Sequence, residues 1–239
     1  MFRSLMICIC LSLSCSIAHA QLEQLEKQLG MGNASTLSDS KVASGLKEAL
    51  KVGAENSVKL TGKTDGYFKN EAIKILMPSN LRTLERGLRA IGFGPKIDSF
   101  ILSMNRSAET AAPAAKKIFT DAILEMSFDD ARKILSGGDT AATDYFKAKT
   151  TDRLTTAFRP VVEKTMSENG VMKQYKGLTE QYQSIPFAKN ETFDVNKYVV
   201  EKALDGLFYE LADQERQIRK NPAARTTSLL KEVFGAARK

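Results

Sequence analysis

The sequence predicts an all-α protein, a compact multi-helix bundle of roughly eight helices that follows a cleaved signal peptide. Three observations support this fold class. Apolar residues recur three or four positions apart through most of the chain, which is the spacing of one helix face. No run alternates between apolar and polar residues for long enough to require a strand. The 239 residues include 15 Gly and 6 Pro, too few for a fibrous or disordered chain.

The first twenty residues have the pattern of a secretory signal peptide. Arg3 gives a positive start, residues 5–17 form an apolar stretch too short to span a bilayer, and Ala18-His19-Ala20 is a small-x-small cleavage site. We therefore expect cleavage after Ala20 and export, to the periplasm in a Gram-negative bacterium. The alternatives are an uncleaved anchor, which the short length and the cleavage site disfavour, and a lipoprotein acylated at Cys15, which lacks the usual Leu three residues before the Cys.

Cleavage would leave a mature chain without Cys or His. All three Cys and the single His lie within the first 20 residues, and the sequence contains no Trp. Thiol and imidazole chemistry, disulfides and metal sites built from His or Cys are therefore excluded for the mature protein. We predict no cofactor and no metal site, and we expect stability to come from core packing.

Residues 21–37 are predicted to be a loosely ordered leader, and residues 38–239 a single all-helical domain. The first helix is expected to begin at Ser38-Asp39-Ser40, which offers capping residues, and to run to about Leu60. Residues 62–70 have the composition of a turn.

A short amphipathic helix and a long kinked one are expected next. Ser79 caps the short helix, and Gly92 and Gly94 stop it. The long helix carries two rows of apolar residues at seven-residue spacing, so one of its faces should pack against partners. Pro113 should kink it, because proline removes a backbone donor and clashes with the preceding turn. The apolar residues are Leu81, Leu84, Leu88 and Ile91 in the short helix, and Ile97, Ile101, Met104, Ala108, Ala111, Ala115, Ile118 and Ala122 in the long one.

Two further helices are expected in the middle of the chain. Ser127-Phe128-Asp129-Asp130 has the form of a capping box and starts a short helix, which Gly137-Gly138 ends. A helix from about Thr140 to Ser167 follows, with a break or kink at Pro160.

Three segments complete the prediction. A helix that begins after Gly170 leads into the longest linker, residues 186–193. Asp194 caps a helix that runs to about Lys220, and Pro222 then permits a final helix. The inward residues are Val200, Leu204, Leu207, Phe208, Leu211 and Ile218 in the helix after Asp194, and Leu229, Leu230, Val233 and Phe234 in the last one.

Arg82, Arg86 and Arg89 share one face of the short helix, because they are spaced by four and three residues. Three guanidinium groups can hold a phosphate or a carboxylate through paired hydrogen bonds, which makes this row a candidate ligand site. Glu85 lies beside the row, and such a row is also typical of a solvated outer face. Both interpretations stay open.

Glu109 is the candidate for catalysis by a carboxylate alone, since sugar cleavage needs a buried carboxyl group as general acid. It lies near the middle of the long helix, beside Asn105 and Arg106, which are candidate ligand-binding residues. The charge of Arg106 favours a carboxylate over a neutral acid, which argues against this role. We favour the structural alternative, a polar network that locks the helix to its neighbours.

The basic excess of the chain is concentrated at its C-terminal end. Residues 216–239 contain seven basic groups and one acid. Such an end can attract anionic lipid headgroups or lipopolysaccharide, whereas export makes nucleic acid the least expected partner. The alternatives are solubility and favourable cations at a helix C-terminus. Glu215 and Arg219 are expected to form an i,i+4 pair on the outer side of their helix. The candidates for binding an anionic surface are Arg216, Arg219, Lys220 and Arg225.

Several stretches of the chain resemble a family of exported bacterial proteins catalogued as domain of unknown function 4197. Together they extend over about residues 40–235. The resemblance implies a helical, exported protein and brings no activity, cofactor or catalytic residue with it. The matching stretches are Gly45-Leu46-Lys47-Glu48-Ala49-Leu50, Met104-Asn105-Arg106-Ser107-Ala108-Glu109, Gly137-Gly138-Asp139 with Ala142-Thr143 and Tyr145-Phe146, Phe158-Arg159-Pro160, Ala203-Leu204-Asp205-Gly206-Leu207-Phe208-Tyr209, and Pro222-Ala223-Ala224-Arg225-Thr226-Thr227.

The leading functional expectation is a non-catalytic periplasmic protein that binds a partner or an anionic, amphipathic ligand at the cell envelope. Export, the basic end and the lack of catalytic side chains point to it. One alternative is a carboxylate-dependent hydrolase of envelope glycans with Glu109 as its acid. Another is a structural or assembly factor without a small ligand. No transmembrane helix is expected in the mature chain.

Overall fold

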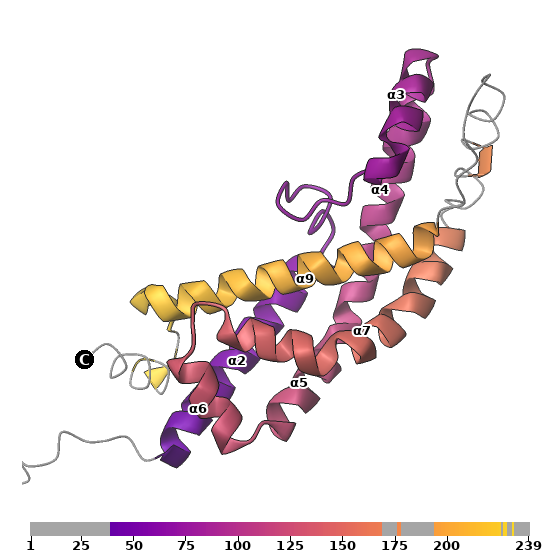
Figure 1. Ribbon diagram of the computed structural model, residues 1–239. Coiled ribbons are helices and arrows are strands. Elements are labelled where there is room, and N and C mark those ends of the chain that lie inside the picture. The colour runs from indigo at the N-terminus through magenta and orange to yellow at the C-terminus, as the bar shows by residue number, and fades with distance from the viewer. Residues whose placement is uncertain (1–38, 169–175, 178–193, 226, 229–230, 232–239) are drawn as a thin grey trace, which may run out of the picture. The chain divides into compact units, whose positions relative to one another are not determined.

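A computed structural model describes residues 39–168, 176–177, 194–225, 227–228 and 231. They belong to one unit, Asp39–Lys239, and consist of helices and the turns between them, with no strand in these ranges (Figure 1). The predicted all-α class is confirmed. The described part contains seven α-helices with defined bounds, so the predicted number of roughly eight is approximate.

Several predicted segments lie outside the described residues. They are the signal peptide with its cleavage site after Ala20, the leader 21–37, the helix after Gly170, the linker 186–193, and the apolar residues of the final helix.

The first half of the chain follows the predicted order. Helix α2 (Asp39–Gly62) ends two residues after the predicted position. A 3-10 turn, η1 (Ser79–Leu81), leads into the short helix α3 (Arg82–Ala90). The long helix is divided into α4 (Gly94–Ala111), η2 (Ala112–Ala114) and α5 (Ala115–Glu125). The division falls at Pro113, because proline has no N–H to continue the α-helical hydrogen bonds.

The predicted capping box is present at the start of α6 (Phe128–Ser136). The Asp130 amide donates to the Ser127 hydroxyl oxygen at 3.1 Å, and the Asp130 carboxylate accepts from the Ser127 amide at 3.1 Å. Two backbone donors that have no partner within the helix are thereby satisfied.

Replacing Ser127 by Ala should lower the free energy of unfolding by about 1 kcal/mol, because the Asp130 amide loses its acceptor. Hydrogen bonds from Ser127 also hold the pKa of Asp130 below its usual value. That carboxylate therefore stabilises the fold above its unfolded-state pKa, and the contribution disappears as the pH falls through the lower folded-state pKa.

The difference in free energy of unfolding between Ser127→Ala and wild type should accordingly be smaller in acid. Urea unfolding at pH 7 and at about pH 3 measures this difference. Ser136→Ala is the control, since that hydroxyl donates only to carbonyl oxygens of its own helix. An equal difference at both pH values would contradict the stabilising interaction between Ser127 and the Asp130 carboxylate.

Helix α7 (Ala141–Glu168) contains Pro160 without interruption, so the alternative of a break there is wrong. The carbonyl that loses its partner belongs to Thr156, and both residues are exposed, which leaves this oxygen open to water. Helix α9 (Val195–Lys220) begins as predicted, with the Asp194 carboxylate accepting from the Lys197 amide at 2.9 Å. The 3-10 turn η3 (Pro222–Ala224) follows it.

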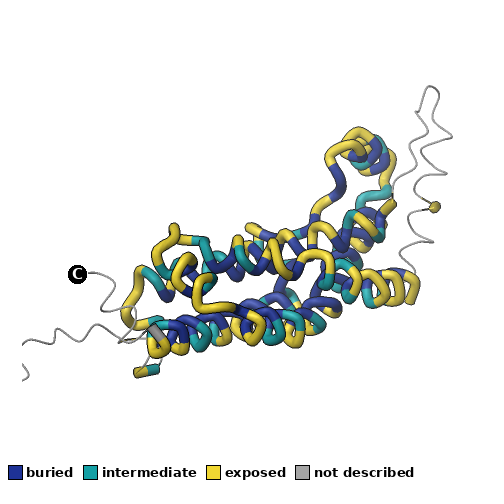
Figure 2. The backbone as a smooth tube through the Cα atoms, turned by 60° about the horizontal axis from the view of Figure 1, so that its bottom comes forward, coloured by how far each residue is buried: buried dark blue, intermediate teal, exposed yellow. Residues whose placement is uncertain are grey.

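Helix α9 lies across α2 and α7 and makes its most extensive contacts with them (Figure 1). Buried residues lie on the faces that the helices turn toward one another (Figure 2). Phe119 is central, with its ring centroid 5.0 Å from that of Phe146 and 6.2 Å from that of Phe208. Gly206 of α9 is required for close packing, because a Cβ there would lie 2.5 Å from the buried Tyr67 ring. The core thus joins helices from both halves of the chain.

Helices α3 and α4 form a hairpin that projects beyond the other helices (Figure 1). The main contacts of α3 are with α4 and η1 alone, whereas α4 also packs on α7 and α9. None of the described helices is long and apolar enough to span a membrane.

Candidate functional site

The projecting hairpin carries the arginine row on α3. Arg82 and Arg86 are exposed, one helical turn apart, and neither makes a hydrogen bond or an ion pair in the described part of the chain. Arg89 is held by two carboxylates: its Nη2 lies 2.7 Å from Oδ1 of Asp98, and its Nε lies 2.9 Å from Oε1 of Glu85. These bonds, that to Asp98 first, raise the pKa of Arg89. Two guanidinium groups are therefore available to a ligand.

The arginines border an open cleft of about 510 Å³ between α3, α4 and the segment that precedes α3. The apolar part of its lining consists of Met77 and Ile101, which are buried, and Leu76, which is 52% exposed. Its volume lies within the range of small-molecule sites, about 300–1,000 Å³. We call this site the α3 cleft. It combines cations for an anionic head with an apolar surface for a short chain.

Asn105, predicted as a ligand-binding residue, instead positions one wall of the α3 cleft. It is fully buried, and its side-chain amide accepts from the Ile75 amide at 2.9 Å and donates to the Ile75 carbonyl at 2.8 Å. A third hydrogen bond runs from the side-chain amide nitrogen of Asn105 to the Ile101 carbonyl at 2.8 Å. Because all three bonds go to the backbone, Asn105 fixes the segment that supplies Leu76 and Met77.

Arg106 and Glu109 hold an earlier part of the same segment. Oε1 of Glu109 accepts from the amides of Tyr67 and Phe68, both at 3.1 Å. Arg106 donates to Oε2 of Glu109 and to Oδ1 of Asp65, both at 2.6 Å. Hydrogen bonds from Lys69 and Arg106 lower the pKa of Asp65. This arrangement agrees with the polar network that the sequence favoured, and it occupies both oxygens of the candidate acid.

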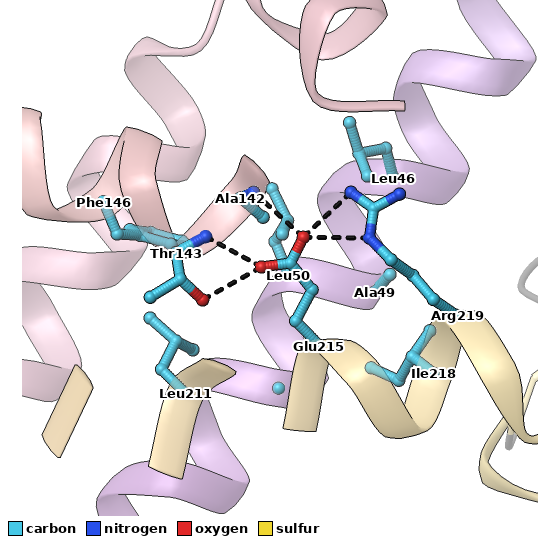
Figure 3. A pocket seen from close by; sticks show the side chains of 11 residues that line it. Leu46, Ala49, Leu50, Ala142, Thr143, Phe146, Leu211, Glu215, Ile218 and Arg219 are labelled. Carbon is cyan, nitrogen blue, oxygen red and sulfur yellow. Dashed lines mark hydrogen bonds and ion pairs between the residues drawn. The ribbon is translucent and has the colours of Figure 1, made fainter. Parts of the chain in front are cut away.

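Glu215 and Arg219 form a buried network, so the prediction that they lie on the outer side of α9 is wrong. The side chain of Glu215 is 8% exposed and that of Arg219 is 13% exposed. Glu215 accepts from the amides of Ala142 and Thr143 and from the Thr143 hydroxyl, each at 2.9 Å (Figure 3). Arg219 donates to Glu215 at 2.9 Å and to the Ile134 carbonyl at 2.8 Å. The pair therefore joins α9 to the start of α7 and to α6.

The adjoining cavity in Figure 3 has a volume of only about 20 Å³. Its other lining residues are mainly apolar and come from α2, α7 and α9. That volume is about the space of one water molecule, so this is a packing gap and not a ligand site.

The predicted anionic-surface residues are largely engaged within the fold. Arg225 is 4% exposed and donates to the backbone carbonyls of Ile218 and Arg219, at 3.0 and 2.9 Å. Its assignment to a membrane-facing surface is therefore wrong, because its guanidinium satisfies the carbonyls at the end of α9. Lys220 pairs with Asp139 and lowers the pKa of that carboxyl group. The fourth candidate, Arg216, pairs with Asp213 at 3.3 Å.

A second open cleft, about 420 Å³, lies between α7 and α9. The cations Lys147, Arg159 and Lys197 line it together with the carboxylates Glu201 and Asp205. Lys197 and Glu201 are 3.9 Å apart. Two carboxylates accompany three cations here, whereas the α3 cleft has three arginines and one carboxylate, Glu85, which is paired with Arg89, so this cleft is less suited to an anion.

A family model described as a protein of unknown function (DUF4197) matches residues 36–235 of the chain. The chain belongs to this family. The resemblance predicted from the sequence is thus confirmed, and the description of DUF4197 assigns no activity. Among curated proteins and solved structures, none matches the chain significantly.

The DUF4197-like stretches of the sequence coincide with contacts that build the fold. Asn105 and Glu109 hold the segment before α3, and Gly206 admits the Tyr67 ring. The arginines of the α3 cleft lie outside those stretches. Membership of DUF4197 therefore accounts for the architecture. The assignment of the α3 cleft as a ligand site depends on its geometry alone.

Proposed function

We propose that this protein is a non-catalytic, periplasmic binding protein of the cell envelope whose α3 cleft holds an anionic amphipathic ligand. The observation that carries the proposal is the pair Arg82 and Arg86, exposed and without ion-pair partners in the described ranges, beside the apolar side chains of Leu76, Met77 and Ile101. Arginine suits a phosphate or carboxylate because its planar fork donates two parallel hydrogen bonds. The apolar side chains offer contact to a short hydrocarbon chain.

Two further features support this function over the alternatives. The signal-peptide pattern of residues 1–20 favours an envelope location. The oxygens of Glu109 accept hydrogen bonds from two backbone amides and Arg106, which disfavours a role as proton donor in a glycan hydrolase. A purely structural factor would not need two unpaired arginines beside an open cleft.

The double substitution Arg82→Gln with Arg86→Gln should weaken the binding of decyl phosphate by at least about 100-fold, because charge-assisted hydrogen bonds contribute about 1.5–3 kcal/mol each. Isothermal titration calorimetry at low salt measures the loss. Wild-type binding should also weaken with added salt, since screening shortens from about 10 Å at 0.1 M to about 3 Å at 1 M.

The matched control is Lys51→Gln with Lys59→Gln, which removes two exposed cations from α2 and should leave the affinity unchanged. Decyl maltoside serves as the uncharged comparison ligand. Equal binding of decyl phosphate by wild type and the arginine variant, or equal binding of both ligands by wild type, would contradict the proposal.

A further inference from the structure

The turn between α3 and α4 is an exposed apolar tip. Between Arg89 and Lys96 the chain has no charged residue, and Ile91 is 56% exposed. Gly92 adopts a φ of 89°, which only glycine accepts readily and which allows the two helices to meet in a tight turn. The turn that carries this exposed side chain lies at the end of the α3–α4 hairpin, which projects beyond the other helices (Figure 1).

Two cations, Lys96 and Arg86, flank this tip. Nζ of Lys96 lies 4.7 Å from the centroid of the Phe93 ring, and Arg86 is exposed on the adjacent turn of α3. Residues 82–98 contain four cations and two carboxylates, and both carboxylates bind Arg89. Three cations of the hairpin are therefore without an ion-pair partner in the described structure, which gives the tip a positive field.

The spacing along α3 matches the depth of a membrane interface. Arg86 precedes Ile91 by five residues, about 7.5 Å along the helix axis. Apolar residues of interfacial segments reach about 5–10 Å into the boundary between headgroups and acyl chains. With the hairpin end-on to a bilayer, Ile91 enters the acyl boundary while Arg86 stays at the level of the phosphates.

We propose that the α3–α4 hairpin docks end-on onto a membrane surface that contains anionic lipids, with Ile91 inserted and Arg86 and Lys96 among the headgroups. The proposal builds on the proposed function, because the α3 cleft then opens where lipid headgroups are available to it. Charge complementarity selects this occupant. A protein partner would need a broad apolar patch, whereas Ile91 is the one large apolar side chain that the described structure leaves exposed in this turn, and cations flank it.

Tryptophan fluorescence tests the docking directly, because the chain has no native Trp. The emission of Ile91→Trp should shift to shorter wavelength when vesicles of phosphatidylglycerol and phosphatidylcholine are added at low salt, and should not shift with phosphatidylcholine alone. Leu124→Trp is the matched control, since Leu124 is 73% exposed at the end of α5, away from the hairpin (Figure 1). An unchanged emission of Ile91→Trp, or an equal shift in both variants, overturns the proposal.

A second variant, Ile91→Ser, measures the contribution of the tip to binding. Cosedimentation should show an affinity for the anionic vesicles that is about 10- to 100-fold lower. This is the loss expected when the transfer of one isoleucine side chain from water into the bilayer is removed. Its affinity for soluble decyl phosphate should be unchanged, because Ile91 does not line the α3 cleft. Vesicle binding equal to that of wild type overturns the docking.

The two assays separate the two hypotheses. Wild type that binds decyl phosphate but gives no Ile91-dependent vesicle binding refutes the docking and leaves the proposed function standing. Wild type that binds anionic vesicles through Ile91 but never binds decyl phosphate refutes the proposed function and leaves the docking standing.

Discussion

Replacing Glu215 by Ala should lower the free energy of unfolding by about 3–5 kcal/mol, the usual cost of removing one partner from a buried ion pair. The substitution leaves Arg219 without its carboxylate at a position where its side chain is 13% exposed. It also leaves the amides of Ala142 and Thr143, at the start of α7, without acceptors. Urea unfolding followed by circular dichroism gives the difference, with the slope against urea checked for two-state behaviour.

Two further variants define the origin of this loss. Glu163→Ala removes an exposed carboxylate from α7 and should change stability by no more than about 0.5 kcal/mol. Glu215→Leu combined with Arg219→Leu removes both charges and should recover part of the loss, because no buried charge is left unpaired. A Glu215→Ala variant within about 1 kcal/mol of wild type would contradict the assigned network.

Helix positions could be predicted because their signals are local. The apolar spacing, the proline at 113 and the capping box at Ser127 each act within a few residues of the chain. The alternative of a break at Pro160 was wrong, because proline removes only one hydrogen bond of the helix and the exposed carbonyl that loses it can accept one from water instead. Local sequence does not reveal which face of the helix the carbonyl lies on.

The contacts of the polar residues could not be predicted, because they join distant parts of the chain. The i,i+4 spacing of Glu215 and Arg219 indicated a pair, but Thr143, which makes the pair a buried network, lies 72 residues away. For the α3 cleft, the arginine row was visible in the sequence. Its apolar lining was not, since Leu76 and Ile101 come from segments on either side of α3 and become neighbours only in the fold.

The substitution Glu109→Ala should also lower the free energy of unfolding by about 3–5 kcal/mol. Glu109 is 4% exposed, and its loss leaves the buried amide of Tyr67 without an acceptor and Arg106 with only one of its two carboxylates. Urea unfolding measures the effect. Asp65→Asn is the control: it removes the charge of the other, more exposed carboxylate of Arg106, keeps a residue type that tolerates the φ of 66° at this position, and should cost much less than Glu109→Ala.

The same residue decides between a binding protein and a glycan hydrolase, because Glu109→Gln keeps the shape and one acceptor oxygen of the side chain. If Glu109 only holds the segment before α3, Glu109→Gln should lower the free energy of unfolding. Wild type and variant should then both release no reducing ends from peptidoglycan. If Glu109 were a general acid, wild type would release them and Glu109→Gln would abolish the release while still folded. Reducing-end release by wild type that the variant lacks, with matching circular dichroism spectra, would refute the binding-protein proposal. Its absence in both proteins would leave Glu109 as the residue through which α4 holds the segment that leads to the α3 cleft.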